Sequence, residues 1–175
     1  MLRSSLKTYK LFRIRGGKLF PLYVEAKREM PIGIWLEAGI GELVDATHVK
    51  ANGCGGRLSL RPGFHSCEVP FTDWIGKRGS DGSLLQRPDT VWCECEIDGE
   101  KIEVTDRYGL RTIPDGWYYF KTNPKQVWPW IISKRIRINR ILSHEEVGSI
   151  CESFGITAQK VWAENDGGLN YGIYK

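Results

Sequence analysis

Four side chains that can do chemistry lie between residues 61 and 97. His65 and Ser66 follow a Pro-Gly turn, and Glu94 and Glu96 are two residues apart in V-W-C-E-C-E-I. A histidine can act as a base or bind a ligand, and carboxylates about 7 Å apart on one strand raise each other's pKa. In a cleft, such a carboxylate can hold a sugar hydroxyl or stabilise a cationic transition state. Glu-x-Glu is also ordinary on a solvated strand face, and a lone histidine can be structural; both alternatives stay open.

Strand alternation separates the two glutamates from the neighbouring cysteines. Residues 91–97 alternate with the period of a β-strand, which directs successive side chains to opposite faces. The odd-numbered residues, which include two cysteines, form one face. The even-numbered ones, Trp92, Glu94 and Glu96, form the other, and the tryptophan argues against full exposure of that face.

Basic residues indicate two places where an anion can bind. Arg13 alternates with apolar residues in Y-K-L-F-R-I and points either into a cleft or outward. The second place is a basic strand, on which we expect Arg135 and Arg137 on one side and Lys134 and Arg140 on the other. This strand, together with loop 76–87, can contact a nucleic acid or another macromolecule, or can be a solvated sheet face.

The five cysteines are odd in number and irregularly spaced. This pattern favours reduced, partly buried thiols of a cytosolic protein over a disulfide framework. A zinc site can be drawn from Cys54, His65, Cys67 and the C-x-C pair. The chain has no C-x-x-C pair, however, so we expect no metal.

Length and composition are those of one ordinary globular domain. The chain has 175 residues, of which 41% are hydrophobic and 26% charged, with a net charge of +4. This mildly positive charge permits anionic partners, but it is weaker than the basic charge typical of a dedicated nucleic-acid binder. The N-terminus has no apolar signal-peptide core, and no run approaches the roughly 18 apolar residues of a membrane span. We expect a cytoplasmic protein with no membrane partner, one domain over residues 1–156 and a tail over 157–175 that can be loosely ordered.

Hydrophobic periodicity and turn residues predict mostly strands and few helices, which indicates the α+β class. The expected strands are residues 9–14 and 19–24, joined as a hairpin by the glycine turn at 15–18, then 33–36 (or one helical turn), 91–97, 101–104, 107–113, 117–122 and 129–142, with a further hairpin turn signal at Asp98-Gly99. On the last run we expect one face to carry Ile132, Ile136, Ile138 and Leu142. A short helix is expected over 68–75. The S-H-E-E capping box at Ser143 predicts a longer helix to about Phe154, ended by Gly155.

Three motifs in combination resemble a domain family found in bacteriophage and prophage proteins. They are R-P-G-F-H, R-P-D-T-V-W-C-E-C-E and I-x-x-N-R-I-L-S-x-E-E-V, and the resemblance covers residues 9–155. The pair G-F-H-x-C-E-x-P and W-C-E-C-E is also similar to a second group of phage-type proteins. These resemblances imply a phage-type protein that acts in the host cytoplasm on a host macromolecule.

A more distant similarity is to the ADP-ribosyltransferases. In their order, the chain has Arg13 on the first strand, Ser66 in G-F-H-S, and Glu94-x-Glu96 late. The similarity implies a strongly bent or split, mainly antiparallel sheet, with Arg13 on the phosphates of NAD, Ser66 bracing the site and Glu96 on a ribose hydroxyl. The chain departs from the family in lacking the Ser-Thr-Ser triplet and in having His65 where many members carry an aromatic residue or threonine.

Two functions follow as hypotheses. The first is an ADP-ribosyltransferase-like protein that binds NAD or a related nucleotide and transfers ADP-ribose to a host macromolecule. In it the catalytic residues are Glu96, Glu94, His65 and Ser66, and the cofactor contacts are Arg13, Arg61 and Trp92. The alternative is a non-enzymatic protein of the anti-defence type that binds a host protein or nucleic acid.

Overall fold

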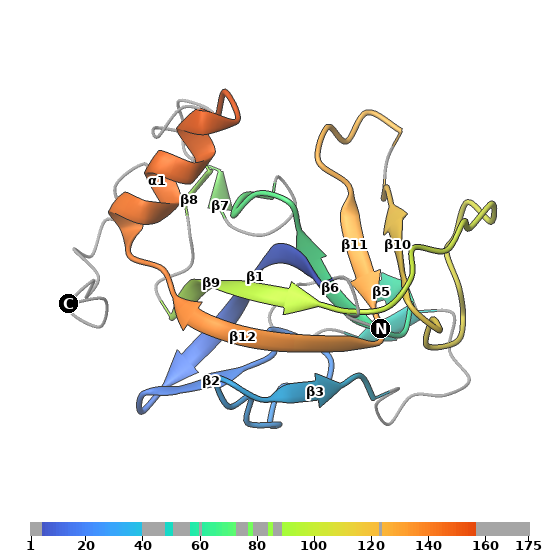
Figure 1. Cartoon of the computed structure of the whole chain (residues 1–175), viewed down its shortest axis with the longest axis horizontal. Helices are drawn as coiled ribbons and strands as arrows, with labels where there is room; N and C mark the ends of the chain where they lie inside the picture. Colours follow the sequence, from blue (N-terminus) through green and yellow to red (C-terminus); the bar gives the residue numbers. More distant parts are fainter. Residues whose placement is uncertain are drawn as a thin grey trace.

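Strands and one helix make up the described part of the chain. The computed structural model describes residues 5–39, 48–50, 57–59, 61–72, 77–78, 84–85, 89–122 and 124–156. The elements are β1 (Leu6–Arg15), β2 (Lys18–Phe20), β3 (Trp35–Glu37), β4 (His48–Lys50), β5 (Arg57–Ser59), β6 (Phe64–Cys67), β7 (Lys77–Arg78), β8 (Leu84–Leu85), β9 (Thr90–Ile97), β10 (Trp117–Phe120), β11 (Trp130–Ser133), β12 (Arg135–Ile141) and α1 (His144–Ser153) (Figure 1). The predictions for Cys54, for the tail 157–175 and for most of loop 76–87 lie outside the described residues.

Eight of the strands form one antiparallel sheet. Its order is β10-β11-β6-β1-β9-β12-β3, and β2 pairs with β1. Within the described residues a single helix accompanies this sheet, so the α+β class with a mainly antiparallel sheet is confirmed. The finer expectation, an architecture like that of the ADP-ribosyltransferases, stays a prediction.

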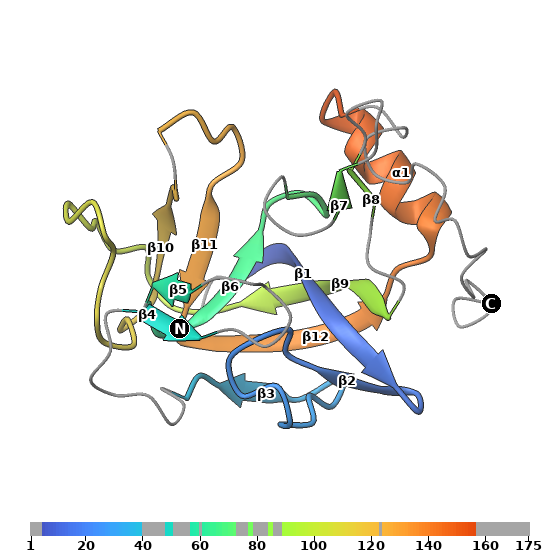
Figure 2. The same cartoon turned by 180° about the vertical axis from the view of Figure 1, so that it is seen from behind.

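The helix and the β10–β11 pair stand at opposite ends of the sheet. Both rise on the same side of β9 and β12, while β2 and β3 lie on the other side (Figures 1 and 2). Three clusters of buried side chains hold these parts together, here named the inner core, the helix-side core and the arm core. The inner core comprises Phe12, Leu19, Met30, Leu36, Phe64, Val91, Cys93, Cys95, Ile97, Ile131, Ile136 and Ile138. The helix-side core comprises Tyr9, Leu11, Leu22, Cys67, Val69, Phe71, Trp92, Leu142, Val147, Cys151 and Ile156, and the arm core comprises Tyr118, Phe120 and Ile132.

The first two strands form the expected hairpin. Gly16 and Gly17 both have positive φ, at 54° and 75°, which matches the twist that a two-residue hairpin turn requires. β2 ends at Phe20 because the next residue, Pro21, has no N–H to donate to the ladder. The strand at 33–36, left open against a helical turn, is β3, and it pairs with β12.

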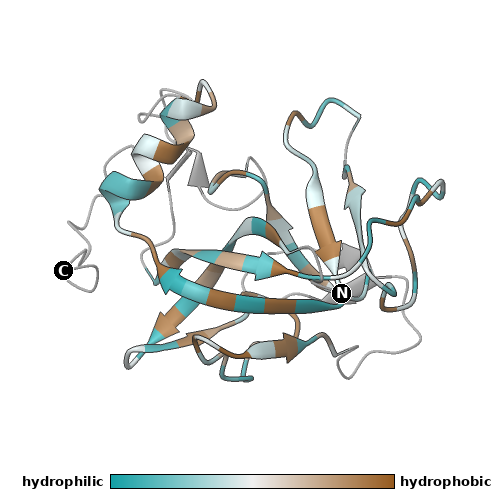
Figure 3. Ribbon diagram, viewed as in Figure 1, coloured by the Kyte–Doolittle hydropathy of each residue, from teal (hydrophilic) through white to brown (hydrophobic). Residues whose placement is uncertain are grey.

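β9 alternates as the sequence predicts. Its inner side chains, Val91, Cys93, Cys95 and Ile97, are all 0% exposed. Its ladder with β1 runs through eight residue pairs, from Leu6–Ile97 to Arg13–Thr90. Alternating polar and apolar residues are visible along β9 and β12 in Figure 3, so both strands bury one face and leave part of the other to water.

The long run 129–142 is two strands, not one, and the prediction for its faces is wrong at both ends. β11 pairs with β10 and β6, whereas β12 pairs with β9 and β3. Ile132 therefore lies in the arm core, away from Ile136 and Ile138. A register shift between Ile138 and Arg140 then inserts an extra residue into β12. Because such a bulge reverses the alternation beyond it, Leu142 lies in the helix-side core.

The predicted strands over 101–104 and 107–113 are not formed. Only Lys101 forms a bridge there, and its partner is Trp117 of β10. The N–H of Trp117 donates to the Glu100 carbonyl at 3.1 Å, and the N–H of Ile102 donates to the Trp117 carbonyl at 2.8 Å. Gly116 permits this contact, since a Cβ there would lie 2.2 Å from the Glu100 carbonyl oxygen. The segment thus pairs with β10 instead of folding back on itself.

The predicted helix over 68–75 is not formed in the part that is described. Residues 68–72 are bends and extended backbone. The N–H of Phe71 donates to the Val69 carbonyl at 2.8 Å, which closes a three-residue turn around Pro70. A proline at this point has no N–H for a helical bond, so the chain turns there.

The helix α1 has the predicted capping box. The N–H of Glu146 donates to Ser143 Oγ at 3.1 Å, and the N–H of Ser143 donates to Glu146 Oε2 at 2.8 Å. Gly155, with φ +77°, ends the helix as expected. The helix buries Val147 and Cys151 in the helix-side core. No helix in the described residues is long and apolar enough to span a membrane.

Candidate functional site

Each of the two glutamates of β9 is paired with an arginine of β12. The ladder sets Arg137 opposite Glu96, and the bulge sets Arg140 opposite Glu94. Arg137 Nη2 donates to Glu96 Oε2, and Arg140 Nη2 lies 3.4 Å from Glu94 Oε2. The sequence predicts Arg140 on the side opposite to Arg137, and the bulge is the reason that this is wrong. We call these residues, with Arg135 and Trp35, the charged face.

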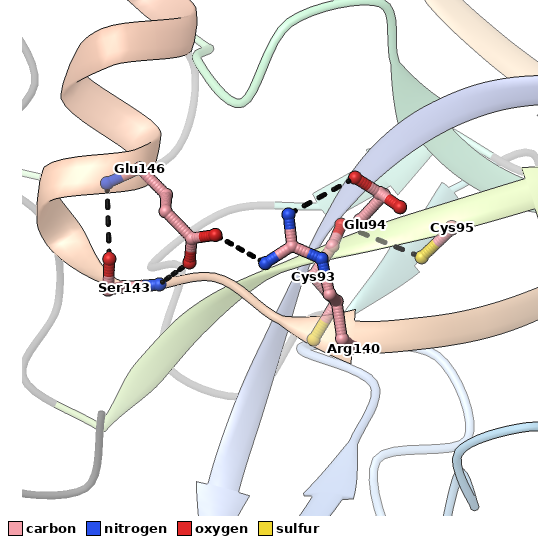
Figure 4. A network of polar contacts seen from close by, with 6 residues as sticks. All are labelled: Cys93, Glu94, Cys95, Arg140, Ser143 and Glu146. Carbon is pink, nitrogen blue, oxygen red and sulfur yellow. Dashed lines mark hydrogen bonds and ion pairs between the residues drawn. The ribbon is translucent and has the colours of Figure 1, made fainter. Parts of the chain in front are cut away.

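Arg140 links the sheet to the helix. Besides Glu94 it donates to Glu146, the residue that completes the capping box of Ser143 (Figure 4). The hydrogen bond that Arg140 donates to Glu146 raises the pKa of Arg140. The backbone N–H of Ser143, followed by Arg140, lowers the pKa of Glu146. The network therefore holds its groups as ions and fixes α1 against β9 and β12.

Trp35 on the edge strand β3 is a feature of the charged face that sequence reasoning missed. Its ring lies 5.0 Å from the Arg135 guanidinium carbon and 5.2 Å from that of Arg137. Arg135 also pairs with Asp98 at 2.6 Å. The signal was present in the sequence, because G-I-W-L contains a tryptophan in a short strand. The contact of this tryptophan with Arg135 and Arg137, however, depends on the pairing of β3 with β12, which no local pattern reveals.

His65 is a neutral side chain held within the protein. Its Nδ1 lies 3.2 Å from the Gly63 carbonyl, to which the neutral ring donates. Burial, followed by the nearby charges of Lys10 and Arg61, lowers the pKa of His65 to about 3. A base this weak is poorly matched to proton abstraction at neutral pH. His65 is better suited to hydrogen bonding than to general-base catalysis.

Ser66 and Arg13 are both occupied by contacts within the fold. Ser66 is 0% exposed and donates to the Ile131 carbonyl at 3.4 Å. Arg13 Nε lies 2.9 Å from Asp89 Oδ2. Arg13 is opposite Thr90 in the ladder and Glu96 is opposite Lys7, so Arg13 and Glu96 are separated by about 20 Å along the strands. The structure does not bring these two residues together.

The remaining expected cofactor contacts lie in different surroundings. Trp92 is 5% exposed and packs in the helix-side core, where its ring is not open to a nucleotide base. The Arg61 guanidinium lies 4.2 Å from the ring centre of Phe120 in the arm core. Arg61 does lie close enough to His65 to lower its pKa. The predicted site is thus divided into a Glu94–Glu96 group, an Arg61–His65 group and the separate residues Arg13, Ser66 and Trp92.

The described cysteines are buried thiols, as the sequence predicts. Cys67, Cys93, Cys95 and Cys151 are in no disulfide. Burial raises the pKa of Cys67, Cys95 and Cys151 to about 12, and that of Cys93 well above its usual value. Thiols in this state are inert toward electrophiles. Among the described residues no group of three or more His, Cys, Asp or Glu side chains is arranged to hold a metal ion.

Comparison with known proteins adds no assignment. No family model, no curated protein and no solved structure matches this chain. Function is therefore inferred from the geometry of the described residues. The charged face offers ion-paired carboxylates beside a tryptophan, and the Arg61–His65 group offers a cation beside a neutral imidazole.

Proposed function

We propose that this protein acts by binding another protein, through the edge of the charged face at β3 and β12. The observation that carries the proposal is Trp35, which lies against Arg135 and Arg137 on a partly exposed sheet face. Tryptophan and arginine are the residues most enriched at the energetic centres of protein interfaces. Guanidinium groups against the ring hold the indole in place, so little conformational freedom is lost on binding.

Exposed apolar side chains precede Trp35 along the same edge of the sheet. Ile32 and Ile34 are 48% and 52% exposed. The N–H of Gly33 between them donates to the Ile138 carbonyl at 2.8 Å, which fixes the segment to β12. Two isoleucines held in this way, next to a tryptophan, are typical of a pre-organised contact surface.

The charges of the face favour a protein over a nucleic acid as the partner. Nucleic-acid binding needs basic side chains that are free to contact phosphates. Here the four expected residues all have carboxylate partners: Asp115 for Lys134, Asp98 for Arg135, Glu96 for Arg137, and Glu94 with Glu146 for Arg140. A face of mixed, paired charges around an aromatic residue fits a protein surface. The resemblance to phage and prophage domains is the reason to expect a host protein.

Site-specific photo-crosslinking tests the proposal. A benzoylphenylalanine is introduced at Ile34 and, as the matched control, at Val127, an equally apolar residue that is 71% exposed in the β10–β11 connection. We expect one protein to crosslink from position 34 and not from position 127 in cells that produce the chain. The added substitution Trp35→Ala should reduce that yield at least tenfold. Crosslinks that are the same at both positions, or that are unchanged by Trp35→Ala, would contradict the proposal.

Transfer of ADP-ribose from NAD is a second candidate function. The sheet order alone supports it: β6, β1 and β9, which carry Ser66, Arg13 and Glu96, are neighbours, while the register leaves Arg13 and Glu96 about 20 Å apart along the strands. A thermal-shift titration tests it: NAD at 100 times its Kd adds about 2.7 kcal/mol to the stability of a protein that binds it. The candidate predicts this shift in the wild type and a loss of transfer in Glu96→Ala. No shift at millimolar NAD excludes it.

A further inference from the structure

Arg61 differs from the other arginines that are at least partly buried. In the described residues these are Arg13, Arg28, Arg61, Arg135 and Arg137. Four of them pair with a carboxylate within 4 Å, and Arg61 has no such partner among the described residues. Its Nε is enclosed by the protein and makes no hydrogen bond there. Burial of this uncompensated charge lowers the pKa of Arg61.

The arm core holds Arg61 in a fixed position. The guanidinium lies 4.2 Å from the centre of the Phe120 ring, a stacking that restricts its movement. Gly109 packs against the stem of Arg61, since a Cβ there would lie 3.0 Å from Arg61 Cδ and 3.0 Å from Tyr118 Oη. Tyr118 Oη accepts a hydrogen bond from the Leu110 N–H at 3.1 Å. The guanidinium is thus pre-organised, and it donates no hydrogen bond to any described residue.

A second cation adds to the positive potential around His65. Lys10 Nζ donates to the His65 carbonyl at 2.7 Å and has no carboxylate partner in the described chain, and burial lowers the pKa of this ammonium group. The charges of Lys10 and Arg61 both disfavour protonation of His65, and among the described residues no acidic side chain opposes their effect on it. Two uncompensated cations and a neutral imidazole therefore occupy one region. Such a region attracts an anion, and a fork of N–H donors matches the oxygens of a phosphate.

We propose that Arg61, together with Lys10 and His65, forms a binding site for a phosphate group. The guanidinium donates to two phosphate oxygens, Lys10 supplies the second positive charge, and neutral His65 presents its ring beside them. The phosphate can be inorganic phosphate or the phosphate of a nucleotide, because the site recognises the shared oxyanion. This site is separate from the protein-binding face around Trp35, so either proposal can fail without the other.

Calorimetric titrations at constant ionic strength test the site. The probes are inorganic phosphate, adenosine monophosphate, adenosine and potassium chloride. We expect phosphate and the nucleotide to bind and adenosine and chloride not to bind; a tighter nucleotide identifies the source as a nucleotide, and equal affinities identify the bare phosphate. Arg61→Met keeps an apolar stem over Phe120 and should weaken binding at least tenfold. The matched control is Arg107→Met, which removes an exposed arginine that lies 4.4 Å from the Tyr108 ring.

A second readout does not depend on the stability of the Arg61 variant. Bound phosphate, which is the monoanion at the pH of this titration, should raise the pKa of His65 from about 3, as followed by the NMR shifts of its ring protons with and without phosphate in the wild-type protein. A rise of the His65 pKa in phosphate but not in chloride supports the site. Equal affinities in Arg61→Met and the wild type, equal effects of phosphate and chloride, or an unmoved His65 pKa would each overturn it.

Discussion

The two faces of β9 show how one strand can serve two purposes. On the inner face Val91, Cys93, Cys95 and Ile97 are all 0% exposed and meet β1 and β12 in the inner core. On the outer face Glu94 and Glu96 keep 19% and 25% of their side chains exposed and pair with arginines. Burial of apolar surface is worth far more than exposed ion pairs. The inner face therefore supplies the stability, and the outer face is free to specify contacts.

A substitution that opens a cavity in the inner core should cause the largest loss of stability. Ile138 is 0% exposed and pairs with Cys95 across the ladder, so Ile138→Ala removes packed atoms that the surroundings cannot replace. We expect a loss of about 2–5 kcal/mol in the free energy of unfolding, measured by urea denaturation. The control Ile34→Ala, at a side chain that is 52% exposed, should cost no more than about 0.5 kcal/mol. Similar losses in both variants would contradict the conclusion that the buried inner face supplies the stability.

Lowering the pH should have the next largest effect on the free energy of unfolding, through protonation of His65. In the unfolded chain the ring takes up a proton near its usual pKa of 6.5, but in the folded protein only near 3. The unfolded state therefore binds more protons below pH 6.5, and stability falls as the pH drops from 6.5 towards 3. The loss from this group is at most about 1.4 kcal/mol per pH unit.

The substitution His65→Asn isolates this contribution. Denaturation of the wild type and the variant between pH 7 and pH 4.5 should show a smaller slope of unfolding free energy against pH in the variant. If both proteins lose stability in parallel, His65 is not held neutral by the fold.

Removing the helix cap should have an intermediate effect. α1 covers the apolar half of the outer face, and Ser143 Oγ accepts the N–H of Glu146 at its start. Ser143→Ala should lower the free energy of unfolding by about 1 kcal/mol. Ser153 at the other end bonds only within the helix, to the Ile150 carbonyl, so Ser153→Ala is the matched control and should have a smaller effect. Equal effects would mean that the cap does not fix the helix.

The charged face itself should contribute least to stability. Glu96→Gln removes a partly exposed ion pair with Arg137, for which we expect a loss of less than about 1 kcal/mol. The loss should shrink as salt is raised, because exposed charges are screened. A double-mutant cycle with Arg137→Met measures the coupling of the pair directly. A coupling of several kcal/mol would show that the outer face stabilises the fold, which would contradict the conclusion that the inner face supplies the stability.

Local patterns predicted the elements that depend on local physics. The alternation of β9, the glycine turn of the first hairpin and the capping box at Ser143 are set by neighbouring residues, and all three are confirmed. The failures depend on distant partners. The segment after Asp98 pairs with Trp117 instead of with itself, and the bulge in β12 appears only when β9 is its neighbour.

The candidate site was less predictable than the fold for the same reason. Glu94 and Glu96 share a face, as the alternation requires, but their arginine partners depend on the bulge. Arg13 and Glu96 follow one another in the expected order along the chain, yet the register of β1 with β9 sets them at opposite ends of the ladder. Trp35 and Arg61 gain their significance from neighbours that are far away in the sequence.

We propose that Glu94 and Glu96 are ion-pairing residues of a protein-binding surface and not catalytic carboxylates. The most direct test measures release of nicotinamide from NAD, with cell extract as acceptor, by the wild type, Glu96→Gln and the matched variant Glu103→Gln. Glu103 is a suitable control because its side chain is 84% exposed and its ion pair with Lys101 lies on the surface. We expect the same background rate for all three proteins. A wild-type rate at least a hundredfold above background that is lost in Glu96→Gln and kept in Glu103→Gln would contradict it.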